Sequence, residues 1–271
     1  MFGAIIGDLA GSIYEFGQIK TVSPIQMKKT IEDSAFISDD SILTIAIADA
    51  ILNKKDYADS LREWALKYSN FKPNVQPYFQ TIFSPGFTKW AHGTEVGTSS
   101  GNGAMMRVSP VGHLFDTEQE VIENARLATV PSHNSEDAVI AATLVALIIF
   151  YSRKGMSKEE IIKKLDIKLN KPNITKFNMT CNDTVDVCLY SLFNSNSYEE
   201  SLRLALSFGG DTDTNACIVG SMAEAMFGVP EKLKKQALKK VPEDFIPIIN
   251  QFCERTNKNI QPNKTTEVPS V

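Results

Sequence analysis

The 271-residue sequence predicts an all-α fold, and three observations support this prediction. Apolar residues recur at the three- and four-residue spacing of amphipathic helices through most of the chain. Patterns typical of β-strands are limited to residues 20–25 and 28–31, which are too short to establish a sheet. Outside one long segment, Pro and Gly punctuate the chain between the helical stretches. We therefore expect helices joined by loops.

The predicted helices follow one another along the chain. Residues 7–15 form a helical stretch with Gly7 and Gly11, and each glycine costs a helix about 1 kcal/mol relative to alanine, which suggests close packing there. The longest apolar run, residues 138–151, is too short to cross a bilayer and predicts a buried helix. A capping box at residues 157–160 starts another helix. Helices are also expected at residues 41–52, 56–68, 118–129, 136–151, 183–193, 197–208, 214–227 and 245–252.

The exception to the helical pattern is the segment 70–103, which is rich in Pro, Gly and Ser. A loop of this length inside a compact domain is usually functional, so we expect it to contribute to a site. Its aromatic residues Phe83, Phe87 and Trp90 either pack the core or supply a ring that stacks on a base.

Composition and charge narrow the possible functions. A net charge of −4 and a pI near 5.5 argue against a broad nucleic-acid-binding surface. The four cysteines show no CxxC or zinc-site spacing, and no secretory signal or membrane span is apparent. We therefore expect a cytoplasmic protein with reduced thiols and no membrane association. Without an evident linker, we expect a monomer with one domain at residues 1–255 and a polar tail at residues 256–271.

Two acidic clusters stand where predicted helices begin: SDDS at residues 38–41 and DTDT at residues 211–214. Either cluster alone is well explained as a helix cap, because Ser, Asp and Thr are preferred caps and negative charge suits a helix N terminus. Together they offer the carboxylate and hydroxyl oxygens that Mg²⁺ and Mn²⁺ prefer. If the two helix starts meet, four carboxylates converge, and without a cation some of them must be protonated.

A glycine-rich segment, SSGNGAMMR at residues 99–107, ends the long loop. Gly101 and Gly103 let the backbone approach a ligand closely, and exposed N–H groups form a cradle for phosphates, although Gly-Asn-Gly is also an ordinary turn. His133 precedes a long predicted helix. An isolated histidine is more often structural, but a position at a helix N terminus suits a phosphate contact.

The first predicted helix also carries two acidic residues, Glu15 and Asp8, for which the local sequence predicts ordinary structural roles. Glu15 lies about one turn beyond Gly11 on the same helical face, where a solvated surface glutamate is the general expectation. Asp8 is expected to bond to nearby backbone or to the end of a neighbouring helix.

These segments occur together, and in the same order, in a known family. The sequence resembles the ADP-ribosylglycohydrolases of the dinitrogenase-reductase-activating and serine-ADP-ribose hydrolase types. The resemblance implies a compact orthogonal helical bundle with a binuclear centre of two divalent cations, Mg²⁺ or Mn²⁺. The matching stretches are GDLAGSIYE at 7–15, SDDS at 38–41, SGNGAMMR at 100–107, the His133 segment and FGGDTDTNACIVG at 208–220.

The resemblance also implies a role for each matching residue. Glu15, Asp39 and Asp40 would be catalytic, since Glu15 matches a glutamate that lies beside the metals and the scissile bond in the serine-type enzymes. Ser38 stands where the family usually has threonine and retains the hydroxyl, whereas Ser100 replaces the aromatic residue that often precedes Gly-Asn-Gly. The adenine-stacking residue is therefore left unassigned. The implied metal ligands are Ser38, Asp39, Asp40, Asp211, Asp213 and Thr214. The implied substrate-binding residues are Ser99, Ser100, Gly101, Asn102 and Gly103 at the diphosphate and the adjacent ribose, and His133 at a phosphate.

The implied activity is hydrolysis of the glycosidic bond between ADP-ribose and a modified protein side chain or a small ADP-ribosyl conjugate. Such cleavage needs stabilisation of an oxocarbenium-like state and an activated water. Two metals can orient the ribose hydroxyls and lower the pKa of a water, and an adjacent carboxylate can move the proton. The acceptor (serine, arginine, a nucleic-acid end or a small molecule) and the choice between Mg²⁺ and Mn²⁺ are left open.

Two other functions compete with this interpretation. A catalytically inactive ADP-ribose-binding or structural relative would be favoured by loss of Asp39 or Asp213, and both residues are present. An all-α, metal-dependent nucleotide pyrophosphatase would usually show Glu-x-x-Glu pairs on facing helices. Here the acidic residues are mainly aspartates at helix starts.

Overall fold

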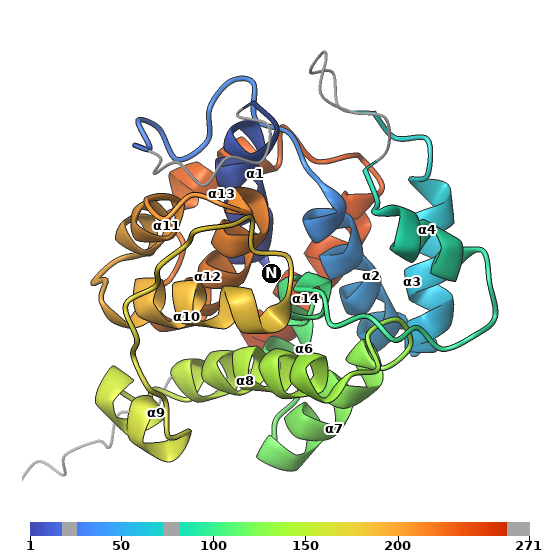
Figure 1. Cartoon of the computed structure of the whole chain (residues 1–271). Helices are drawn as coiled ribbons and strands as arrows, with labels where there is room; N and C mark the ends of the chain where they lie inside the picture. The colour runs from blue at the N-terminus through green and yellow to red at the C-terminus, as the bar shows by residue number, and fades with distance from the viewer. Residues whose placement is uncertain (18–25, 73–81, 259–271) are drawn as a thin grey trace, which may run out of the picture.

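Helices form nearly all of the regular structure in the computed structural model, which describes residues 1–17, 26–72 and 82–258 (Figure 1). No β-strand occurs in these residues, and the extended pairing among them consists of isolated bridges between Thr98 and His133 and between Gly101 and Thr180. The all-α prediction is confirmed. The helices are α1 Phe2–Gly17, α2 Asp39–Asn53, α3 Tyr57–Lys67, α4 Pro85–Ala91, α5 Gly103–Met106, α6 Ser109–Leu114, α7 Glu118–Thr129, α8 Glu136–Arg153, α9 Lys158–Lys164, α10 Cys181–Phe193, α11 Tyr198–Leu206, α12 Thr212–Phe227, α13 Glu231–Ala237 and α14 Phe245–Lys258.

Most predicted helices between residues 41 and 252 begin within two residues of their expected starts, but the long segment 70–103 is not the uninterrupted loop that we expected. It contains α4, in which the Ser84 hydroxyl accepts a hydrogen bond from the Phe87 N–H and Pro85 occupies the first turn. Residues 73–81 of this segment and residues 20–25 lie outside the described part of the chain. The prediction of a continuous loop was wrong because the helix is only about two turns long and its cap was read as loop composition.

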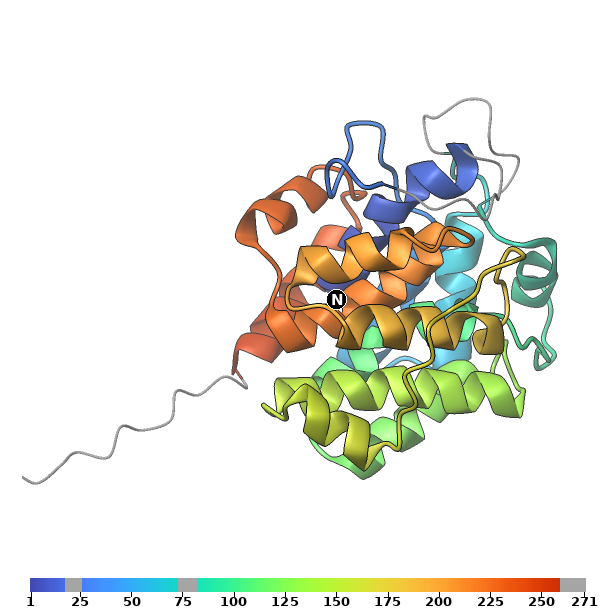
Figure 2. The ribbon, with the colours of Figure 1, turned by 60° about the vertical axis from the view of Figure 1, so that its left-hand side comes forward.

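The core is built on helices that are apolar on almost every side. All positions of α2 from Asp40 to Ala50 are buried, as are those of α12 from Thr212 to Ala223, whereas α8 is buried on every side only from Val145 to Ser152. Figure 1 shows α8 lying across the view whereas α1 and α2 run up it, and in Figure 2 α8 still lies across the lower part of the molecule after the rotation. This crossing arrangement is the orthogonal bundle that the sequence resemblance implied.

Helices α1 and α12 pack with their backbones in direct contact, although almost 200 residues separate them along the chain (Figure 1). A methyl group added at Gly7 would lie 2.0 Å from the carbonyl oxygen of Ala216, and one at Gly3 would lie 2.1 Å from that of Gly220. Van der Waals contact between such atoms requires well over 3 Å, so these positions admit only glycine. The close packing predicted from Gly7 is confirmed.

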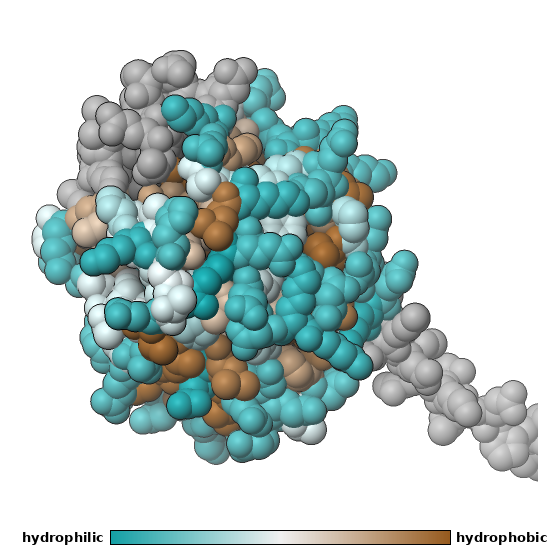
Figure 3. Space-filling view, turned by 90° about the vertical axis from the view of Figure 1, so that its right-hand side faces the viewer, coloured by the Kyte–Doolittle hydropathy of each residue, from teal (hydrophilic) through white to brown (hydrophobic). Residues whose placement is uncertain are grey.

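The face of the molecule that carries α3 and α4 is mainly polar (Figure 3). Hydrophilic residues cover most of this face, with hydrophobic groups between them. None of the helices in the described residues combines the length and apolarity needed to cross a membrane. Helix α14 continues to Lys258, past the predicted start of the tail, and residues 259–271 lie outside the described residues.

Candidate active site

The N termini of α2 and α12, which carry the two acidic clusters, meet beside the middle of α1. Ser38 caps α2, and its hydroxyl accepts a hydrogen bond from the Asp40 N–H at 3.2 Å. Asp211 occupies the cap position of α12 without making a side-chain cap hydrogen bond. Asp213 stands in the first turn of α12. The capping interpretation therefore holds for Ser38, whereas the side chain of Asp211 does not cap α12.

Three buried carboxylates from three helices converge at this junction. One oxygen each from Asp8, Asp40 and Asp213 lies within 4.8 Å of the others. The hydroxyl groups of Ser38 and Thr214 lie 3.0 Å and 3.3 Å from Oδ2 of Asp40 and donate to it. The other oxygen, Oδ1 of Asp40, is buried and has no hydrogen-bond partner among the described residues. An anionic oxygen without a donor is costly inside a protein, so a cation is the fitting partner.

Asp8 links α1 to the start of α2. Its carboxylate accepts hydrogen bonds from the Ser38 N–H at 2.9 Å, the Ser41 N–H at 3.1 Å and the Ser41 hydroxyl. The expectation that Asp8 bonds to a neighbouring helix end is confirmed. Because the glycine contacts fix α1 against α12, Asp8 is also held close to Asp213.

Burial and mutual repulsion favour the protonated forms of these carboxyl groups when no cation is bound. Burial raises the pKa of Asp8 to about 6, against the hydrogen bonds that lower it. Burial, together with the charges of Asp8 and Asp211, raises the pKa of Asp39 to about 7 and places that of Asp40 well above its usual range. A hard divalent cation would offset the same repulsion, and the oxygen-only donor set fits Mg²⁺ or Mn²⁺.

A cavity of about 460 Å³ opens directly onto the acidic cluster. Asp39, Asp211, Asp213 and Thr214 line one part of it, whereas Ser38 and Asp40 are buried and do not line it. The glycine-rich loop and His133 line another part. The other lining residues are Leu43, Ile82, Phe83, Ser84, Pro85, Phe87, Met106, Arg107, Phe177 and Met179.

The glycine-rich loop is fastened to the acidic cluster by Asn102. Its side-chain amide donates to Oδ2 of Asp211 at 2.7 Å and to the carbonyl oxygen of Asn178 at 3.1 Å. Ser99, Gly101 and Gly103 line the cavity, but Ser100 does not; its carbonyl oxygen accepts a hydrogen bond from the Cys181 N–H. The Asn102 side chain therefore binds protein groups and sets the position of the loop, leaving the glycine backbone facing the cavity.

His133 lies at the boundary between this loop and the segment that precedes α8. The extended bridge with Thr98 brings it beside the loop, and its side chain is buried. Helix α8 begins at Glu136 with Ser135 as its cap, so His133 stands ahead of the helix and not in its first turn. Burial, reinforced by the charge of Arg107, places the pKa of His133 well below its usual range. The ring is therefore neutral.

Comparison with known proteins gives this geometry its context. Residues 1–262 match the family model described as ADP-ribosylglycohydrolase. The chain belongs to the ADP-ribosylglycohydrolase family. It is 22% identical to human ADP-ribosylhydrolase ARH3, over 93% of this chain and 87% of that protein. It is 24% identical to ADP-ribosyl-[dinitrogen reductase] glycohydrolase of Rhodospirillum rubrum, over 84% of each chain. A solved structure titled ADP-ribosylglycohydrolase-related protein complex has the same fold, with a TM-score of 0.69, 17% identity and coverage of 94% and 95%.

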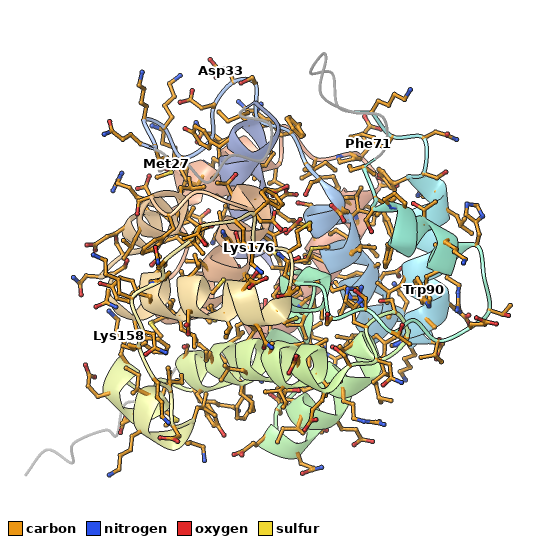
Figure 4. All side chains as sticks on the ribbon, viewed as in Figure 1. Met27, Asp33, Phe71, Trp90, Lys158 and Lys176 are labelled. Carbon is orange, nitrogen blue, oxygen red and sulfur yellow. The ribbon has the colours of Figure 1, made fainter. Side chains whose placement is uncertain are left out.

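Glu15 is one of the residues that carry the family resemblance. Its backbone lies in the last turn of α1, and its side chain falls outside the described part of the molecule. The aromatic residues of the long segment divide between two environments. Phe83 and Phe87 line the cavity with ring centroids 5.6 Å apart. Trp90, labelled in Figure 4 beside α3 and α4, lines an adjoining hollow, and the Arg62 guanidinium lies 4.6 Å from its ring centroid.

The sequence analysis missed several residues of this ADP-ribosylglycohydrolase site. Arg107 ends the quoted glycine-rich segment but had no assigned role, and it proves to be a cavity-lining cation with 1% of its surface exposed. An arginine within the otherwise apolar stretch from Ala104 to Val108 was the available signal. Phe177 and Met179 enter from the segment before α10, and nothing local in the sequence marks them.

Proposed function

We propose that this ADP-ribosylglycohydrolase is a metal-dependent hydrolase that cleaves the glycosidic bond between ADP-ribose and an acceptor and releases ADP-ribose. The observation that supports this most strongly is the junction of the acidic cluster and the glycine-rich loop in one cavity of about 460 Å³. Pockets of this size hold small-molecule ligands. One end of the cavity suits cations and ribose hydroxyls, and the other suits the diphosphate.

Two divalent cations, Mg²⁺ or Mn²⁺, are the proposed cofactors. The fit rests on the oxygen-only donor set, on the convergence of carboxylates within 4.8 Å, and on the unpartnered Oδ1 of Asp40. Asp8 positions the start of α2 at this site, because its carboxylate accepts a hydrogen bond from the Ser38 N–H. The proposed ligands are Ser38, Asp39, Asp40, Asp211, Asp213 and Thr214.

The reaction replaces the bond between the anomeric carbon of the distal ribose and an acceptor oxygen or nitrogen with a bond to water. The cations, when bound, supply Lewis acidity to the attacking water and orient the ribose hydroxyls. A carboxylate of Glu15, Asp39 or Asp40 accepts one proton of the water while the water oxygen bonds to the anomeric carbon, and this proton is then passed to the departing acceptor atom, which leaves protonated. The negative charge of these side chains also stabilises the developing oxocarbenium character.

The glycine-rich loop holds the other end of the substrate. The loop formed by Ser99, Ser100, Gly101, Asn102 and Gly103 receives the diphosphate and its ribose; Ser100 and Asn102 act by positioning the loop, through their hydrogen bonds with Cys181 and Asp211. His133 contacts a phosphate. We further propose a cytoplasmic monomer with one domain at residues 1–255 and a tail at 256–271, acting on an ADP-ribosylated protein or a small ADP-ribosyl conjugate.

The test is an incubation of the full chain with Mg²⁺ or Mn²⁺ and a panel of ADP-ribosylated serine, arginine and nucleic-acid substrates. Mass spectrometry should detect free ADP-ribose with at least one substrate, and chelation of the cation should stop its release. Release of AMP instead would indicate a nucleotide pyrophosphatase. Binding of ADP-ribose without turnover of any substrate would indicate an inactive ADP-ribose-binding protein.

A further inference from the structure

The surroundings of His133 distinguish its two ring nitrogens. Nδ1 lies 2.8 Å from the hydroxyl oxygen of Ser132. Nε2 faces the glycine-rich loop, since a methyl group at Gly103 would lie 3.1 Å from it and one at Gly101 would lie 3.5 Å from it. His133 lines the cavity, and no hydrogen bond joins Nε2 to any residue that the structure describes. The glycines therefore leave open space beside Nε2, where a ligand atom fits.

Arg107 determines the direction of the hydrogen bond between Ser132 and His133. Its Nη2 donates to the Ser132 hydroxyl oxygen at 2.8 Å and to the carbonyl oxygen of Ala128 at 3.1 Å. A guanidinium group has only donors, so Ser132 must accept this bond. The hydroxyl oxygen could also accept a second hydrogen bond, but the hydroxyl proton would then have no acceptor, because Nδ1 of His133 is the other hydrogen-bonding contact of this hydroxyl among the described residues. Nδ1 is consequently the acceptor, and a neutral ring must carry its proton on Nε2.

We propose that Arg107 and Ser132 are positioning residues that hold His133 as the Nε2–H tautomer, so that this N–H is a donor for an oxyanion in the cavity. That the oxyanion is a phosphate group of ADP-ribose rests on the proposed function. The tautomer itself rests on the hydrogen-bond geometry of the free protein and on the neutral charge of the buried ring, and not on the proposed function.

The same arrangement explains why the His133 ring is neutral where it contacts an oxyanion. Arg107 is buried, and its charge together with the burial of His133 disfavours an imidazolium ring. The site therefore offers the anion a directed N–H dipole from His133. The opposite tautomer would point a nitrogen lone pair at the anion and repel it, so the Arg107–Ser132–His133 relay determines whether the contact attracts or repels.

The tautomer is directly measurable by NMR of the ring nitrogens in the full chain. The sequence contains only three histidines, and a spectrum of His133→Gln assigns the signals. We expect Nε2 protonated and Nδ1 unprotonated in the wild type at neutral pH. Ser132→Ala should replace this pattern with a mixture or with the Nδ1–H form, and Ser132→Thr should restore it. Ser135→Ala is the matched control, because this hydroxyl caps α8 and should affect stability without changing the tautomer.

The second readout is the affinity for ADP-ribose, measured by calorimetry with Mg²⁺ present. Ser132→Ala should weaken binding about threefold to tenfold, the loss expected when one hydrogen bond to a charged group is weakened. Thermal unfolding of each variant confirms that it is folded. An Nδ1–H or doubly protonated ring in the wild type would overturn the proposal, as would an unchanged tautomer in folded Ser132→Ala. A correct tautomer in a protein that neither binds nor hydrolyses ADP-ribose conjugates would refute the proposed function and leave the relay intact.

Discussion

Replacing Gly7 with alanine tests how tightly α1, the helix that carries Asp8, packs against α12. The added methyl group would lie 2.0 Å from the Ala216 carbonyl oxygen and 2.5 Å from its carbonyl carbon. Carbon atoms pack at about 3.5–4.0 Å, so the helices would have to separate by roughly 1.5 Å. Neither neighbouring atom belongs to a side chain that can rotate away. The substitution must therefore shift the backbone of one helix.

The expected size of the effect combines two opposing contributions. Overpacking of a rigid contact costs about 3 kcal/mol, whereas alanine favours a helix over glycine by about 1 kcal/mol. We expect Gly7→Ala to lower the free energy of unfolding by about 2 kcal/mol, measured by urea denaturation. Gly86→Ala is the matched control: Gly86 lies in α4 with nothing near the added methyl group, so this variant should be about as stable as the wild type or slightly more stable. A Gly7→Ala protein as stable as the Gly86 variant would refute the reasoning.

Three further predictions concern the cluster, the loop and a buried histidine. Asp213→Ala should abolish ADP-ribose release in the mass-spectrometric assay, while Asp59→Ala, an exposed aspartate in the first turn of α3, should retain it. Asn102→Ala removes the amide that donates to Asp211 and should raise the KM for an ADP-ribosyl substrate at least tenfold, since charge-assisted hydrogen bonds contribute about 1.5–3 kcal/mol; an unchanged KM would argue against the anchoring role. Burial lowers the pKa of His113 from 6.5 to about 3, so the unfolded chain takes up a proton that the folded protein does not, and stability is lost as the pH falls below 6.5. His113→Leu should remove this loss. As the pH falls from about 6.5 to 5, the unfolding free energy of the wild type should therefore decrease relative to that of the variant, with a slope approaching 1.4 kcal/mol per pH unit. A difference between the two proteins that stays constant over this pH range would contradict the prediction.

The sequence predicted those parts of the structure that depend on local signals. Helix α7 has its expected bounds because the Thr117 and Glu120 pair forms a capping box and the apolar spacing continues to Thr129. The glycines of α1 indicated close packing because glycine is unfavourable within a helix, although the partner helix was not identifiable from the sequence. Helix α4 was missed because its short span offers too little periodicity.

The site was predictable in its residue types and less so in its contacts. The two acidic clusters could be paired only through the family resemblance, because their meeting depends on α1, which touches both helix starts. The partners of Asp8 and Arg107 lie more than 20 residues away in sequence, so a local pattern can mark these residues but does not identify what they bind. The orientation of Asn102 towards Asp211 likewise follows from the packing of distant segments.

The hydrogen bond between Asn102 and Asp211 joins the two halves of the cavity energetically as well as spatially. A ligand that draws the glycine-rich loop into one position biases the orientation of the Asp211 carboxylate, and a cation that holds this carboxylate biases the loop. Thermodynamic linkage requires any such effect on affinity to be equal in both directions. Under the proposed function, the affinity of the loop for its ligand and the affinity of the cluster for its cation are therefore linked, and each should be measured at a stated occupancy of the other.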